Sequence, residues 1–144
     1  MKSGNGSGQE KFALIVENGT VDKLMAASIL AAGAAAMGKE VLVFLTFGGL
    51  MAFRKGAMNA PMVLPNEFQG MEQHLAKIMR EKNVPHWLQN FQQAKEVGEV
   101  KVLACGATMD MFDLKRDDLE PIVEDVVGVA RFIEVTEGAQ ILFI

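Results

Sequence analysis

The chain has 144 residues, of which 50% are hydrophobic and 22% charged, a length and composition typical of one globular domain. Its 14 basic and 18 acidic residues give a formal charge of −4, which argues against a general binder of nucleic-acid phosphates, because that function needs a clustered basic surface. A single cysteine, Cys105, excludes an internal disulfide framework, and with only two histidines beside it a structural zinc site is not expected. This cysteine usage favours a reducing compartment, and we expect a cytoplasmic protein.

Residues 1–10 are rich in glycine and serine and lack the apolar segment of a signal peptide. We expect them to form a flexible arm in front of a single domain that covers residues 11–144. The longest apolar stretch, residues 24–37, is shorter than the roughly 20 residues that cross a bilayer, so no membrane span is expected.

Apolar runs alternate with helical patterns along the rest of the chain. Strands are predicted at residues 11–17, 40–46, 100–104, 123–127 and 140–144. Helices are predicted at residues 21–37, 50–55, 71–83, 85–97, 108–112 and 128–137, with Gly38 and Gly138 as helix-ending residues. Residues 56–70 contain Pro61 and Pro65 and are predicted to be a long loop, which is usually a lid, a binding loop or an interface.

This order predicts an α/β fold: a mostly parallel sheet of about five strands with helices on both faces. Ligands of such sheets bind beyond the carboxyl ends of the strands. The search for a functional site therefore narrows to residues 18–22, 46–50 and 104–110.

Cys105 follows a predicted buried strand directly and precedes a predicted short helix. The backbone N–H groups of Gly106, Ala107 and Thr108 can point at its sulfur, and the start of a helix favours an anion. Such a setting lowers the pKa of a thiol and raises the fraction of reactive thiolate. A cysteine that simply fills the core as a small apolar side chain fits the same pattern.

The other two loops have both a functional and a structural interpretation. Asn18, Gly19 and Thr20 can form an anion-binding turn, or a simple turn with Thr20 as the N-cap of the next helix. Neither nucleotide-binding glycine pattern is present. The second loop consists of Thr46, Phe47, Gly48 and Gly49. Its glycines can either form a tight turn or leave room for a ligand or adduct.

Several segments together resemble the DsrE/DsrF-like sulfur-carrier superfamily, most closely the branch often labelled "peroxiredoxin family protein". The main one is residues 104–119, ACGATMDMFDLKRDDL, and it is joined by residues 19–23, 44–50, 126–130 and 142–144. The resemblance covers nearly the whole chain after the N-terminal arm. Two positions depart from the pattern: Gly48 stands where the branch commonly has a large aromatic residue, and Asp113 where it usually has glycine.

The resemblance implies a flavodoxin-like three-layer sandwich, a homo-oligomer such as a trimer or tetramer, and Cys105 as the active cysteine. In such a protein the cysteine carries sulfane sulfur or a thiosulfonate group and passes it to an acceptor thiol. The partners would be sulfur-donor and acceptor proteins or small sulfur compounds. No metal or organic cofactor is needed, so we expect none, and the choice between catalyst and stoichiometric carrier stays open.

Two other functions remain as alternatives. A one-cysteine thiol peroxidase needs an activated thiolate and a route from sulfenic acid back to thiol, and this chain has no second cysteine to resolve it. A non-catalytic oligomeric module would use the α/β pocket to bind a small anion.

Overall fold

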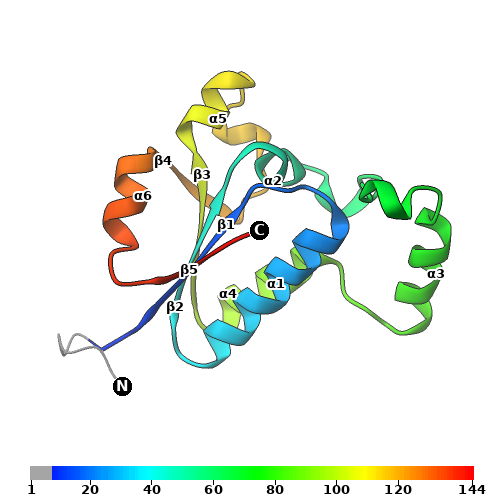
Figure 1. Ribbon diagram of the computed structural model, residues 1–144, viewed down its shortest axis with the longest axis horizontal. Helices are drawn as coiled ribbons and strands as arrows, with labels where there is room; N and C mark the ends of the chain where they lie inside the picture. Colours follow the sequence, from blue (N-terminus) through cyan, green and yellow to red (C-terminus); the bar gives the residue numbers. More distant parts are fainter. Residues whose placement is uncertain (1–7) are drawn as a thin grey trace.

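Five parallel strands form the sheet, in the spatial order β4-β3-β2-β1-β5 (Figure 1). The computed structural model describes residues 8–144, so most of the predicted N-terminal arm lies outside the described residues. The strands are β1 (Lys11–Val16), β2 (Glu40–Leu45), β3 (Glu99–Cys105), β4 (Val123–Val127) and β5 (Gln140–Phe143). All five predicted strands are therefore confirmed.

Six α-helices connect the strands within the described residues. They are α1 (Val21–Ala36), α2 (Phe47–Ala52), α3 (Glu72–Glu81), α4 (Trp87–Val97), α5 (Gly106–Met111) and α6 (Val129–Val135). Gly38 and Gly138 have φ of 84° and 80°, as expected of glycines that end helices. None of the helices in residues 8–144 has the length and apolar character needed to cross a bilayer.

Alternation along the strands divides the core into two layers. Leu14, Val43 and Val102 point to one face, where α1 and α4 cover them. Phe44 and Leu103 point to the other face, where the ring of Phe132 from α6 stacks on Phe44 at a centroid distance of 4.3 Å. In Figure 1 the strands run between α6 and the α1–α4 pair. Helices on both faces and a single α/β domain are thus confirmed.

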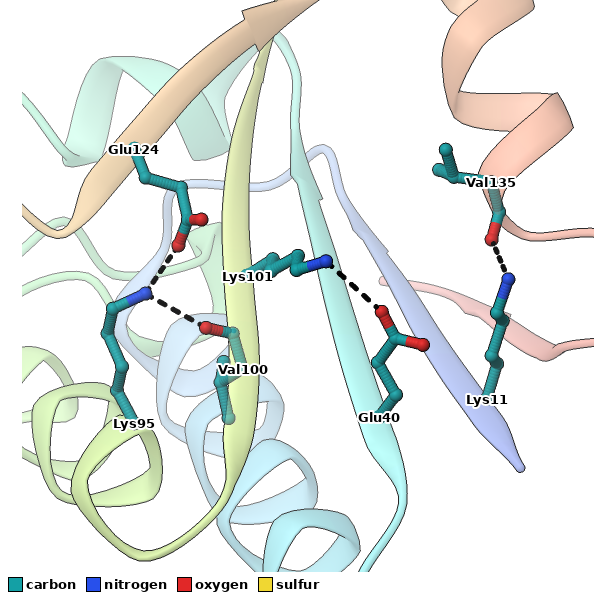
Figure 2. A network of polar contacts seen from close by, with 7 residues as sticks. All are labelled: Lys11, Glu40, Lys95, Val100, Lys101, Glu124 and Val135. Atoms are coloured by element: carbon teal, nitrogen blue, oxygen red, sulfur yellow. Dashed lines mark hydrogen bonds and ion pairs between the residues drawn. The ribbon is translucent and has the colours of Figure 1, made fainter. Parts of the chain in front are cut away.

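Lysine side chains link neighbouring elements away from the carboxyl ends of the strands (Figure 2). Lys95 on α4 donates to the carbonyl of Val100 on β3 at 2.9 Å and pairs with Glu124 on β4. Lys11 on β1 donates to the carbonyl of Val135 at the end of α6 at 2.8 Å. These contacts join α4 to β3 and β4, and β1 to α6.

Two short helices begin earlier than the sequence predicts. α2 was expected at residues 50–55 but begins at Phe47, and α5 was expected at residues 108–112 but begins at Gly106. Only Thr46 separates β2 from α2, and α5 follows the last residue of β3 directly, so no longer turn precedes either helix. Cys105 is consequently the residue immediately before α5.

Residues 56–70 contain two short 3₁₀ segments, Ala57–Asn59 and Asn66–Phe68, and no strand, in agreement with the predicted loop. The next helix, α3, projects away from the sheet (Figure 1) and has no buried residue. Ile78 of this helix and Met71, the residue before it, are 40% and 41% exposed.

Candidate functional site

Cys105 ends β3 and occupies the N-cap position of α5. Its side chain is half-buried and lies on the face of the sheet that α6 covers, beside the core residues of that layer. In the β3–β4 pair, Cys105 lies opposite Val127. The only cysteine of the chain thus lies at the carboxyl end of the sheet, where ligand sites of such folds occur.

Two threonine hydroxyls meet next to this cysteine. Thr46 follows β2, Thr108 lies in α5, and their Oγ1 atoms are 3.0 Å apart, within hydrogen-bond distance. The N–H of Phe47 donates to Thr108 Oγ1 at 3.3 Å. Because β2 and β3 are neighbours in the sheet, the residues that follow them come together at one edge.

The surroundings of Cys105 favour its thiolate. Burial of the sulfur raises the thiol pKa, but hydrogen bonds from the side chain and N–H of Thr108, the side chain of Thr46 and the N–H of Ala107 outweigh it. The pKa therefore lies below its ordinary value. Since α5 has only six residues, these individual donors give a more specific account than the dipole of a long helix.

Two residues close to the site have a left-handed backbone conformation, Phe47 in α2 and Asp113 after α5. Phe47 has φ of 43°, in the left-handed region that non-glycine residues rarely adopt, and its ring meets that of Phe112 edge-on at 6.1 Å. Asp113, just after α5, has φ of 52°. This position, where the resemblance implies glycine, is thus a left-handed helix end, which aspartate tolerates better than most residues.

The glycines of the second loop serve close packing. A Cβ on Gly49 would lie 2.1 Å from the carbonyl oxygen of Val16, and one on Gly48 would lie 3.0 Å from the nitrogen of Gly19. A Cβ on Gly19 would in turn lie 2.4 Å from the Gly48 oxygen. These contacts press the loop after β2 against β1 and the loop after β1. A large side chain at position 48 would require that packing to change.

The loop of Asn18, Gly19 and Thr20 makes its contacts with the chain itself. The N–H groups of Glu17 and Asn18 donate to the carbonyl of Ile144, at 2.7 and 3.4 Å. Val21 donates to the carbonyl of Val63 at 2.8 Å, and Thr20, although in the N-cap position of α1, makes no side-chain cap. Gly19 and Thr20 line a separate cavity that Cys105 does not reach, so we leave Asn18, Gly19 and Thr20 out of the site that we propose.

A separate cavity of about 680 Å³ lies under residues 57–63. It is lined mainly by apolar side chains of α1, α2 and the long loop, together with Arg54, Lys55 and His86. Cys105, Thr46 and Thr108 do not line it. Cys105 therefore does not open into this cavity.

His86 has a structural role at the edge of this cavity. Its Nδ1 accepts the N–H of Leu88 at 3.0 Å, and its own N–H donates to the side chain of Gln89 at 3.0 Å, which caps the start of α4. Burial lowers the pKa of His86, partly offset by the Ala57 carbonyl and the Glu120 charge. Among residues 8–144, no group of three or more histidine, cysteine or acidic side chains is arranged to hold a metal ion.

Sequence reasoning placed Thr46 and Thr108 in the candidate loops but assigned no role to their hydroxyls, and it did not include Phe112. A signal for the threonine pair was present, because each hydroxyl follows one of two adjacent parallel strands by no more than three residues. The contact of Phe112 with Phe47 had no comparable signal, since it depends on the left-handed backbone of Phe47.

Comparison with known proteins agrees with this geometry. Residues 8–144 match the model of the DsrE/DsrF/DrsH-like family. The chain is 32% identical over 147 aligned residues to the sulfur carrier protein DsrE2 of Allochromatium vinosum, with 88% of this chain and 92% of that protein covered. It is 34% identical to the uncharacterized protein YrkE of Bacillus subtilis, with 94% and 97% covered.

Solved structures show the same fold at low sequence identity. MTH1491 of Methanobacterium thermoautotrophicum, a protein of unknown function, gives a TM-score of 0.59 at 14% identity, over 94% of this chain and all of that one. The ychN protein of E. coli gives a TM-score of 0.54 at 18% identity, over 95% of this chain and all of that one. The match of residues 8–144 to the family model and the 32% identity to DsrE2 establish that the chain belongs to the DsrE/DsrF/DrsH-like family.

Proposed function

We propose that this protein is a sulfur-trafficking protein that carries sulfane sulfur or a thiosulfonate group on Cys105 and passes it to an acceptor thiol. The observation that carries the proposal is the position of the sole cysteine at the carboxyl end of β3, where neighbouring hydroxyl and N–H groups lower its thiol pKa. The similarity to a relative named a sulfur carrier, over most of both chains, supports the same function.

The loading step needs one thiolate from this chain. Cys105 sulfur attacks the outer sulfur of a donor persulfide, R–S–SH; the new S–S bond forms as the donor bond breaks, which leaves Cys105–S–SH and the thiolate R–S⁻. With tetrathionate, the same attack gives Cys105–S–S–SO₃⁻ and releases thiosulfate. In both cases the donor supplies the second sulfur, so one cysteine is sufficient.

The unloading step is a second exchange, in which Cys105 gives up the outer sulfur that it gained in the first. An acceptor thiolate attacks the outer sulfur, which becomes bound to the acceptor, and Cys105 leaves as a thiolate. A lowered thiol pKa makes Cys105 a better leaving group in this step as well as a larger source of thiolate in the first.

Intact mass spectrometry tests the proposal directly. Incubation of the reduced protein with a persulfide donor should add one sulfur, about 32 Da, and tetrathionate should add about 112 Da, both reversed by a reductant. Cys105→Ser should keep the fold and take up neither group, because the hydroxyl replaces the only thiol of the chain. Wild-type protein that stays unmodified by every such donor, or a serine variant with the same added mass, would refute the proposal.

A homo-oligomer, trimer or tetramer, is part of the proposal. The helix α3 has no buried residue, and Ile78 and the preceding Met71 are each about two-fifths exposed. A second copy that packs on this helix would bury them. Because Cys105 lies at the carboxyl end of β3 and not on α3, donor and acceptor molecules would still reach it in the oligomer.

A further inference from the structure

The cavity under residues 57–63 has the size of a small-molecule site. Its volume of about 680 Å³ lies within the range of roughly 300–1,000 Å³ that is usual for such sites. Gly19 and Gly48, in the segments that follow β1 and β2, line one side of it, so it lies at the carboxyl ends of these strands. Because Cys105 does not line it, the proposed sulfur-carrier function leaves this space without a role.

Hydrogen bonds hold the loop over the cavity at both of its ends. At one end, the N–H groups of Gly56 and Ala57 donate to Glu120 Oε2, at 2.8 and 3.0 Å. At the other end, the N–H of Val21 at the start of α1 donates to the carbonyl of Val63 at 2.8 Å. The chain itself therefore fixes the loop in place, as is usual for sites that are formed before a ligand binds.

The walls of the cavity favour a ligand with an apolar body. Three half-buried methionines line it from three different elements: Met51 on α2, Met62 in the loop and Met79 on α3. Trp87, at the start of α4, adds an aromatic ring that packs on Phe53 at a centroid distance of 4.9 Å. Methionine side chains are unbranched and adaptable, and they are common at surfaces that accept apolar ligands. An inorganic anion would leave most of these side chains without a contact.

The charged groups of the cavity favour an anion. Arg54 and Lys55 both line it, whereas no acidic residue of the described chain does. Within residues 8–144, neither cation lies at ion-pair distance from an acidic side chain. Glu120, which binds the adjacent N–H groups of Gly56 and Ala57, also makes no ion pair with either of them. Two cations without an acidic partner thus lie beside an apolar space.

We propose that this cavity binds a small organic anion with an apolar body, of the class of medium-chain carboxylates. The apolar body would lie among Met51, Met62, Met79 and Trp87, and the anionic group would lie at Arg54 and Lys55. This site goes beyond the proposed sulfur-carrier function and does not depend on it.

The single tryptophan of the chain makes the test direct. Trp87 lines the cavity, so a change in tryptophan fluorescence on binding reports on the cavity itself. Decanoate is titrated into the full chain below its critical micelle concentration at pH 8, where the ring of His86 next to Trp87 stays neutral. We expect a saturable change, with roughly fourfold tighter binding for each methylene added from hexanoate to decanoate. Isothermal titration calorimetry of the same samples should give one decanoate per chain.

Variants test the anionic group and the apolar body separately. Arg54→Gln and Lys55→Gln should each weaken decanoate binding about threefold and leave the binding of 1-decanol unchanged, because an exposed charge pair contributes modestly. Arg131→Gln is the matched control, since Arg131 pairs with Glu134 on α6 and does not line the cavity, and it should bind decanoate like wild type. Ala60→Phe places a larger side chain at an exposed position that lines the cavity, and it should weaken the binding of both decanoate and 1-decanol.

Several results would overturn the proposal. Absence of binding in both fluorescence and calorimetry would mean that the cavity takes no such ligand, and unweakened binding in Ala60→Phe would place the ligand elsewhere. Decanoate and 1-decanol that bind equally would remove the role of the cations, and an equal effect of sodium sulfate would remove that of the apolar walls. Binding that appears only in Ile78→Glu, a variant designed to dissociate the proposed oligomer, would mean that a second copy of the chain occupies the cavity.

Discussion

Gly49→Ala should destabilise the protein far more than the addition of one methyl group suggests. Gly49 is buried at the start of α2, and an added Cβ would lie 2.1 Å from the carbonyl oxygen of Val16 and 2.8 Å from its carbonyl carbon. Ordinary contact begins at 3.4 Å, so α2 and β1 must separate by about 1.3 Å. Both partners are backbone atoms, which cannot rotate away as a side chain can.

The magnitude follows from the contacts that this movement stretches. The N–H of Gly49 donates to the carbonyls of Thr46 and Glu17, at 3.0 and 3.1 Å. Overpacking costs about 1–3 kcal/mol, and each weakened hydrogen bond costs about 0.5–1.5 kcal/mol. We therefore expect the free energy of unfolding to fall by about 3 kcal/mol, a large part of the roughly 5–15 kcal/mol available to a domain.

Denaturant unfolding of three proteins provides the comparison: wild type, Gly49→Ala and Gly33→Ala. Gly33 lies inside α1, and an added Cβ there would meet no atom within 4 Å. Its replacement should raise the free energy of unfolding by about 0.5–1 kcal/mol, because alanine is a better helix former than glycine. If Gly49→Ala unfolds at the same midpoint as wild type, the close approach of α2 to β1 does not govern stability.

Gly49→Ala should also change the surroundings of Cys105. Thr46 lies three residues before Gly49, and its 3.0 Å contact with Thr108 is within 0.5 Å of the longest hydrogen bond that the geometry allows. A displacement of α2 by more than that amount would break the contact. The thiol pKa of Cys105 should then rise in Gly49→Ala and remain unchanged in Gly33→Ala.

Two further predictions concern pH and assembly. Burial holds the pKa of His86 below its ordinary value of about 6.5, so the folded protein favours the neutral ring. The contribution of His86 to the free energy of unfolding should therefore be complete above pH 6.5 and should be lost as the pH falls through the folded pKa. His86→Asn, which keeps an acceptor for the N-cap but cannot titrate in this range, should flatten the stability profile between about pH 5 and 7, and an unchanged profile would exclude His86 as its source. Sedimentation at micromolar concentrations should show a trimer or tetramer that Ile78→Glu shifts toward smaller species, whereas a wild-type monomer throughout would refute assembly.

The fold was predictable because its signals are local and repeated. Most strands are short apolar runs, and Gly38 and Gly138 mark helix ends through a conformation that favours glycine. The predicted start of α2 was three residues too late and that of α5 two residues too late, for a physical reason. Glycines near a strand end predict a turn, yet Gly49 is required by the approach of another strand, which no local pattern reveals.

The position of Cys105 could be predicted in part for the same reason. A cysteine directly after a buried strand lies at the carboxyl edge of a parallel sheet, whatever the details of the loop. The hydrogen bonds that arrange its surroundings could not be predicted, because they join Thr46 and Phe47 to Thr108, 62 and 61 positions away. That pairing depends on the register of β2 against β3 and on the left-handed backbone of Phe47.

The loop after β2 therefore contributes to the site through its packing. Gly49 brings the loop against β1, Phe47 adopts a strained conformation that aims its N–H, and Thr46 lies beside the buried hydroxyl of Thr108. A hydroxyl can rotate about its C–O bond, whereas a backbone N–H is fixed by the peptide plane. The fixed groups of this loop thus meet the buried hydroxyl of Thr108, and the side chains of both threonines lower the thiol pKa of Cys105.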